Sequence, residues 1–164
     1  MLNVKEIVLC AAIIFLGVLL GASIYESVVM APNYRANIPE SLEHARKFMS
    51  VTNPGNFFRI AAPLAQISLL VSLILNWKRP RGRRWWLITA LILVVIADVI
   101  TFTFHYPRNA ILFTNPMSVA PQELQQAANE WAYGNYIRFS LVAMSLICSL
   151  IAFKTEKLEV RTEK

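Results

Sequence analysis

Four long apolar stretches, separated by polar segments, form the dominant pattern along the chain. They run over about residues 7–24, 57–76, 85–106 and 136–153. Each is close to the roughly 20 residues that a helix needs to cross about 30 Å of hydrocarbon, and none alternates strictly like a half-buried strand. Backbone polar groups in lipid must be satisfied within their own segment, which favours helices. The pattern therefore predicts an all-α fold, a bundle of four transmembrane helices.

Two polar loops, residues 26–56 and 107–135, join the first span to the second and the third to the fourth. In the first loop, residues 41–49 predict a short amphipathic helix. In the second, Pro121 stands where a first-turn proline belongs, so we expect a helix that runs from there into the fourth span. The two loops are thus predicted to carry short helices over one end of the bundle.

Pro107 follows the third apolar stretch directly. Proline lacks a backbone N–H, and its ring clashes with the preceding helical turn. We therefore expect the third helix to break at Pro107 and Asn109 to lie on a turn above the bundle. Residues 1–155 then form one membrane domain, and residues 156–164 form a tail.

The composition agrees with a membrane protein and argues against a water-soluble enzyme. Hydrophobic residues make up 56% of the chain and charged residues 16%, with a mean hydropathy of +0.48; soluble domains carry roughly a quarter charged residues. Cys10 and Cys148 lie singly in apolar stretches, which gives no support to disulfide exchange or zinc binding. The sequence predicts no metal or other cofactor.

The distribution of basic residues predicts the topology. Lys and Arg gather in the loop at residues 78–84, in the tail and at Lys5. Such residues concentrate on the cytoplasmic side of membrane proteins, and an even number of spans places both termini on one side. We expect a protein of the cell (inner) membrane with cytoplasmic termini and extracytoplasmic loops. The basic loop then needs no nucleic-acid partner.

Gly17 and Gly21 form a GxxxG motif, which permits close helix approach. Packing within the bundle is its expected role, with dimerisation as the alternative. The expected partners are the lipid bilayer and an apolar small molecule, and the sequence is compatible with a homo-oligomer.

Ionisable side chains inside a bilayer are costly and mark functional or paired sites. Asp98, Thr101 and His105 fall within an arc of about 60° on one face of the third span. Asp98 lies about 12 Å below the outer end of that span, and Gln66 lies about 13 Å below the outer end of the second. Because Asp98 is too deep to reach the headgroups, we expect it to pair with His105 or with Arg59 or Arg138.

Other polar residues near the outer end add to this picture. Arg59 shares a helix face with Gln66, and the first span ends in Tyr25 and Glu26. Trp131, Asn135 and Arg138 recur at helical spacing on one face of the fourth span. Together they predict a polar pocket that opens outward. Snorkelling of either arginine to the headgroups and an interfacial Glu26 are the alternatives.

Four spans, a glycine-containing first helix ending near Glu26, a Pro-x-Asn segment at 107–109 and the Trp131-x3-Asn135-x2-Arg138 motif occur together. Over nearly the whole chain this combination resembles the anthrone oxygenase-like membrane family. Members of known activity oxidise polycyclic anthrones to anthraquinones with molecular oxygen and without metal or flavin. The resemblance implies a substrate site around Trp131, Asn135, Arg138 and Asn109.

A cofactor-independent oxygenase needs a base for an acidic C–H and groups that stabilise the resulting anion. On this interpretation His105, oriented by Asp98, is the expected base. Arg138 and Asn135 would hold the oxyanion, and Trp131 would stack on a flat ring. The alternative is a non-catalytic binding or accessory protein whose Asp, His and Arg network is structural. Transport is disfavoured because the inner half of the spans offers no polar track.

Overall fold

The computed structural model describes residues 3–78 and 81–162, with side-chain detail for residues 3–78 and 82–155. Over these residues it contains helices and no strands, which confirms the all-α prediction. The principal helices are α1 (Val4–Tyr25), α4 (Pro54–Leu75), α5 (Arg81–Ile100) and α7 (Pro121–Thr162). Neighbours around the bundle are α1 with α4, α4 with α5, α5 with α7, and α7 with α1.

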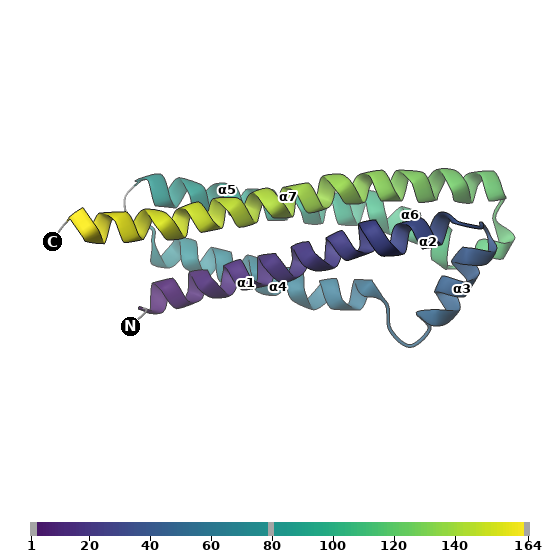
Figure 1. Cartoon of the computed structure of the whole chain (residues 1–164), viewed down its shortest axis with the longest axis horizontal. Coiled ribbons are helices and arrows are strands. Elements are labelled where there is room, and N and C mark those ends of the chain that lie inside the picture. Colours follow the sequence, from purple (N-terminus) through teal and green to yellow (C-terminus); the bar gives the residue numbers. More distant parts are fainter. Residues whose placement is uncertain (1–2, 79–80, 163–164) are drawn as a thin grey trace.

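Shorter elements complete one end of the bundle. They are two π-helical turns, η1 (Glu26–Met30) and η2 (Thr101–His105), the helices α2 (Ala31–Arg35), α3 (Glu40–Phe48) and α6 (Tyr106–Phe113), and the 3₁₀ turn η3 (Pro116–Ser118). Figure 1 places α2, α3 and α6 at the end of the bundle opposite both chain termini. We call this the lid end, and the other the terminal end.

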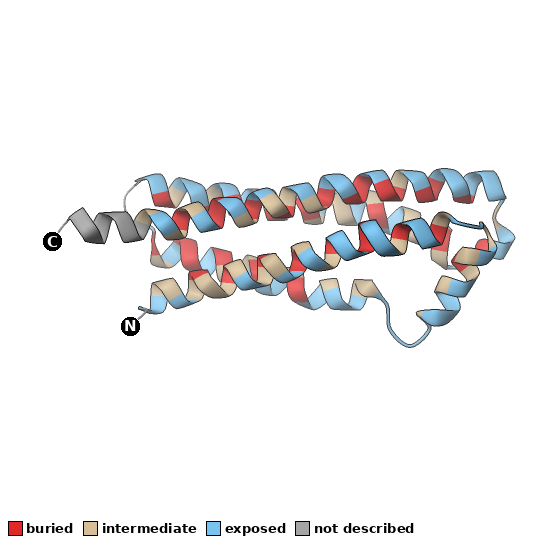
Figure 2. Cartoon of the chain, viewed as in Figure 1, coloured by how far each residue is buried: buried red, intermediate tan, exposed pale blue. Residues whose placement is uncertain are grey.

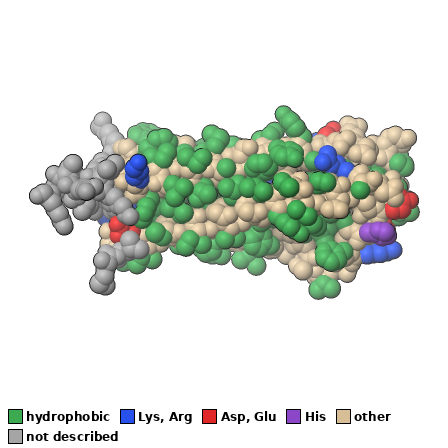
Figure 3. All heavy atoms as spheres, in the orientation of Figure 1, with side chains coloured by type: hydrophobic (Ala, Val, Ile, Leu, Met, Phe, Trp, Pro, Cys, Tyr) green, Lys and Arg blue, Asp and Glu red, His purple; other side chains and the backbone are tan. Residues whose placement is uncertain are grey.

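Four helical segments are long and apolar enough to cross a membrane: Val4–Arg35, Pro54–Leu75, Gly82–Phe113 and Pro121–Thr155. Their flanks expose apolar side chains along the bundle, as Figures 2 and 3 show. Three segments extend well beyond the predicted spans at the lid end. Polar residues begin at these positions, so a prediction from hydropathy ends each span too early. Packing against neighbouring elements keeps the backbone helical beyond the predicted ends.

The predicted break at Pro107 is wrong. The backbone stays helical from α5 through η2 into α6, and Pro107 is the second residue of α6. A π-helical turn shifts the hydrogen-bond register by one residue; here the Tyr106 N–H bonds to the Thr101 carbonyl. This shift provides room for the proline ring without a break. Asn109 consequently lies on a helix rather than on a turn.

The first spanning segment also contains a π-helical turn shortly before a proline. The π-helical turn η1 begins at Glu26, six residues before Pro32, just as η2 begins at Thr101, six residues before Pro107. Both turns lie where a spanning helix enters the lid. Single π-helical turns often occur at functional sites because they re-aim side chains, and Glu26 and His105 both lie within them.

Two hydrophobic cores stabilise the molecule. One fills the bundle and includes Leu9, Leu16, Leu69 and Val94. The other lies in the lid, where Tyr34, Leu42, Leu112, Leu124 and Trp131 pack together from α2, α3, α6 and α7. The lid is therefore a packed unit with its own core, and the polar side chains discussed below lie between the two cores.

The GxxxG motif does not pack within the bundle, contrary to expectation. A Cβ atom built on Gly17 or Gly21 would meet nothing within 4 Å, and Gly21 is exposed. The motif therefore faces away from the neighbouring helices. The predicted tail is also an extension of α7, which continues to Thr162; Glu163 and Lys164 lie outside the described residues.

Candidate functional site

Two hollows lie between the lid core and the bundle core. The larger, the upper chamber, has a volume of about 470 Å³, and its walls include Glu26, Tyr34, Phe58, Arg59, Thr101, His105, Tyr106, Asn109, Phe113, Trp131 and Arg138. The smaller, the lower cavity, has a volume of about 170 Å³, and its walls include Leu19, Ala62, Pro63, Val94, Ala97, Asp98, Phe102 and Val142. Phe58, Arg59, Thr101, Tyr106 and Arg138 line both.

Arg138 and Glu26 form a buried ion pair in the wall of the upper chamber. Arg138 Nη2 donates to Glu26 Oε2 at 2.8 Å, and both residues are buried. The Arg138 guanidinium also lies 5.0 Å from the centre of the Phe58 ring. These contacts rule out the alternatives in which Arg138 or Glu26 extends to the headgroups. Arg138 Nε is buried and has no hydrogen-bond partner among the described residues.

His105 is almost completely buried, at 1% exposure, and it lines the upper chamber. Neither ring nitrogen makes a hydrogen bond of standard geometry to a described residue. The ring packs edge-to-face on Trp131 at 5.5 Å between centres, and a Cβ atom built on Gly134 would lie 3.3 Å from His105 Cε1. A buried, unpaired imidazole is costly, so its position in a cavity wall is consistent with a partner that comes from a ligand.

Trp131 forms a rigid part of the same wall. Its indole Nε1–H donates to Asn109 Oδ1 at 2.7 Å, which joins α7 to α6. The continuation of α6 past Pro107 makes this contact possible. Trp131 and Asn109 were both predicted at the site, and both line the upper chamber.

Asp98 does not pair with His105, Arg59 or Arg138 as expected. Its Oδ2 accepts a hydrogen bond from Gln66 Nε2 on α4, and the carboxyl group lines the lower cavity. The match in depth between Asp98 and Gln66 that the sequence indicated is therefore correct. The predicted orientation of His105 by Asp98 is wrong, because the π-helical turn η2 separates the two side chains into different hollows.

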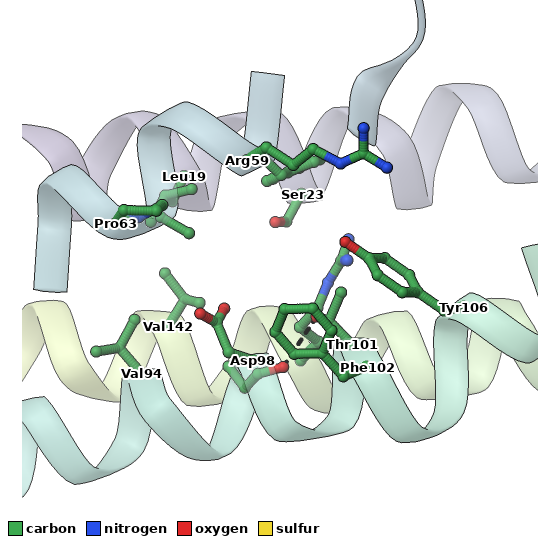
Figure 4. Close-up of a pocket in the computed structure, with 14 residues that line it drawn as sticks. Leu19, Ser23, Arg59, Pro63, Val94, Asp98, Thr101, Phe102, Tyr106 and Val142 are labelled. Carbon is green, nitrogen blue, oxygen red and sulfur yellow. Dashed lines mark hydrogen bonds between the residues drawn. The ribbon is translucent and has the colours of Figure 1, made fainter. Parts of the chain in front are cut away.

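Asn135, Tyr25 and Arg59 were also predicted at the pocket, but Asn135 and Tyr25 lie outside both hollows. Asn135 is fully buried and outside both hollows; its Nδ2 donates to Ser27 Oγ at 2.6 Å and thereby joins α7 to η1. Tyr25 is 57% exposed and lines neither hollow. Arg59 lines both hollows, but its side chain is exposed and extends toward the lid end in Figure 4.

The sequence analysis did not predict a cluster of side chains next to His105. The Arg108 guanidinium lies 3.4 Å from the centre of the Phe104 ring and bonds to Glu130 at 2.6 Å. Phe104 in turn lies against Gly134, since a Cβ atom there would be 2.4 Å from Phe104 Cε1. Gly134 is the only glycine of α7, and its presence in the sequence could have indicated that α7 approaches η2 closely at this point.

The lid adds a cation at the rim of the upper chamber. Arg46 of α3 lines the chamber and donates two hydrogen bonds to Glu43, at 2.7 and 2.8 Å. These bonds lower the pKa of Glu43 to about 2. The pair therefore stays charged at neutral pH. Among the described residues no group of three or more His, Cys, Asp or Glu side chains is placed to hold a metal ion.

The fold and site together define a class of protein: a multi-pass, four-helix membrane protein with a polar chamber beneath a helical lid. Residues 48–148 match the family model described as Anthrone oxygenase, and the chain belongs to the anthrone oxygenase family. The matched segment contains His105, Trp131 and Arg138, whereas Glu26 precedes it. No curated protein and no solved structure matches the chain significantly.

Proposed function

We propose that this protein is a cofactor-independent oxygenase that acts on a flat, apolar aromatic substrate with an acidic C–H bond. The observation that carries the proposal is His105, a buried imidazole whose nitrogens make no hydrogen bond of standard geometry to a described residue, in the wall of a 470 Å³ chamber. Membership of the anthrone oxygenase family supports the same class of reaction. The lid end faces the extracytoplasmic side of the cell membrane in this proposal.

The roles of the chamber residues follow from their chemistry. His105 accepts the proton from the substrate C–H, since an imidazole can act as a base near neutral pH. Arg138, which lines the chamber, stabilises the oxygen of the resulting enolate. Trp131, fixed by Asn109, forms a wall for the ring system. Asn135 has a positioning role, because it anchors α7 to η1 instead of contacting the substrate.

The proposed reaction balances without a further reductant. Loss of one proton to His105 leaves a carbanion, which transfers electrons to O₂ and forms a C–O bond; the peroxide anion then takes the proton back from His105 and becomes a hydroperoxide. His105 removes the second proton from that carbon, the O–O bond breaks, and the hydroxide that leaves takes up this proton. The products are a carbonyl group and one water molecule, so a CH₂ group and O₂ become C=O and H₂O.

Replacement of His105 tests this function. We expect His105→Ala to lower the rate of O₂ consumption with anthrone as the probe by about 100-fold or more, the usual contribution of a general base. His44→Ala is the matched control, since His44 is an exposed side chain on α3, and it should retain the wild-type rate. Equal rates for the wild type and His105→Ala, with both proteins folded, would refute the proposed role of His105.

A second function is a non-catalytic ligand-binding protein. It is favoured by the three polar contacts that tie the helices together, Glu26–Arg138, Asn109–Trp131 and Ser27–Asn135, because satisfied contacts of this kind stabilise a scaffold. Such a protein would bind anthrone or anthraquinone without consuming O₂. The same assay, combined with a binding measurement, therefore separates the two functions.

A further inference from the structure

The lower cavity is a candidate second part of the ligand site. It is lined mostly by apolar side chains of α1, α4, α5 and α7, with the Asp98 carboxyl group among them. In Figure 4 this carboxyl group points into the space between α5 and α4, opposite Leu19 and Pro63. The proposed chemistry at His105 does not use this cavity.

The lower cavity adjoins the upper chamber. Five residues line both, among them Thr101, Tyr106 and Arg138. Figure 4 shows the Tyr106 hydroxyl and Asp98 directed toward the same interior space. An elongated ring system seated beside Trp131 can therefore extend past Arg138 toward Asp98.

The lower cavity also reaches the lipid-facing flank of the bundle. Phe102 and Pro63, on its two sides, are both exposed. Of the four pairs of neighbouring long helices, α4 and α5 pack least extensively against each other. Pro63 lacks an N–H and so leaves the Arg59 carbonyl without its helical hydrogen bond. A ligand dissolved in the bilayer can reach the cavity between these two helices.

Asp98 gives the cavity a chemical preference. Gln66 Nε2 donates to Asp98 Oδ2 and holds the carboxyl group in place, while the side chain remains accessible in the cavity wall. A carboxyl oxygen in apolar surroundings is stabilised by a hydrogen-bond donor and opposed by a purely apolar neighbour. The ligand that fits best has a donor at this position.

We infer that the lower cavity binds the far end of a membrane-dissolved aromatic ligand and that Asp98, positioned by Gln66, accepts a hydrogen bond from a hydroxyl group there. The inference rests on the proposed function only in that the same ligand occupies the upper chamber. It adds a residue that determines specificity: Asp98 distinguishes a ligand with a hydroxyl group at this position from one without it.

The test measures binding and so does not depend on turnover. The protein is placed in phosphatidylcholine nanodiscs with Trp131 as the only tryptophan, after replacement of the three at the terminal end (Trp77→Phe, Trp85→Phe and Trp86→Phe). Quenching of its fluorescence reports binding of three probes: anthraquinone, 2-hydroxyanthraquinone and 1-hydroxyanthraquinone. A second background that retains Trp77 alone corrects for probe that merely dissolves in the bilayer.

We expect 2-hydroxyanthraquinone to bind at least about tenfold more tightly than anthraquinone, as for a hydrogen bond to a carboxyl group. The 1-hydroxy isomer should resemble anthraquinone, because its hydroxyl bonds internally to the adjacent carbonyl. Asp98→Leu should remove the preference while changing the affinity for anthraquinone less than about twofold. Asp98→Asn, which keeps an acceptor oxygen, should retain part of it.

Two results would overturn the inference. Equal affinities for anthraquinone and the 2-hydroxy probe, or a preference that survives Asp98→Leu, would show that Asp98 does not select a hydroxyl group and would leave the His105 proposal intact. Absence of quenching by all three probes would reject both proposals, because the upper chamber itself would then not bind such ligands.

Discussion

At the scale of single residues, burial determines what each polar group can do. Arg138 and Glu26 neutralise each other, and Asn135 and Trp131 bond to neighbouring elements. His105 differs because its ring nitrogens make no hydrogen bond of standard geometry to a described residue. A group that is buried at a cost and left without a partner is the best candidate for binding a ligand.

The Glu26–Arg138 pair gives a stability prediction at this scale. Arg138→Met leaves Glu26 buried and unpaired, so we expect the free energy of unfolding to fall by about 3–5 kcal/mol. The double variant Glu26→Leu/Arg138→Met removes both charges and should recover most of that loss. Thermal unfolding in detergent measures the difference. A single variant as stable as the wild type would show that the pair is not buried as described.

At the scale of elements, the close approach of α7 to η2 explains how His105 is held. Gly134 allows Phe104 to lie against α7, and Arg108, tied to Glu130, covers the other face of that ring. Phe104 therefore has little freedom to move. The π-helical turn η2 then directs the next residue, His105, into the upper chamber.

Gly134→Ala tests this arrangement. The added Cβ would lie 2.4 Å from Phe104 Cε1 and 3.3 Å from His105 Cε1, so the rings must shift. We expect a loss of about 1–3 kcal/mol in stability, as for overpacked cores. Gly17→Ala, where a Cβ meets nothing, is the control and should leave stability nearly unchanged. A loss as large at Gly17 as at Gly134 would contradict the packing.

The number and order of the helices could be predicted from hydropathy, because lipid requires long apolar segments. The faces of Asp98, Gln66 and the Trp131–Arg138 motif followed from helical periodicity. The pairing of Asp98 with Gln66 instead of His105 could not be predicted, because η2 adds a residue to one turn and so changes the angle between positions 98 and 105. The continuation of the helix through Pro107 also depends on η2 and could not be predicted for the same reason.

At the scale of the whole molecule, the two cores create the site between them. The bundle core supplies spanning helices, the lid core closes one end, and the upper chamber and lower cavity remain where the two cores meet. In the proposed reaction, exclusion of water from this space would strengthen the interactions of Arg138 and His105 with a developing charge.

The central claim is that a flat aromatic ligand binds in the upper chamber beside His105. The most direct measurement is an experimental structure of the protein in lipid with anthraquinone bound. We predict planar density along the Trp131 wall, with the ligand within hydrogen-bonding or van der Waals distance of the His105 ring and near Arg138. Anthraquinone bound only on the outer flank, with side chains filling the upper chamber, would contradict the account.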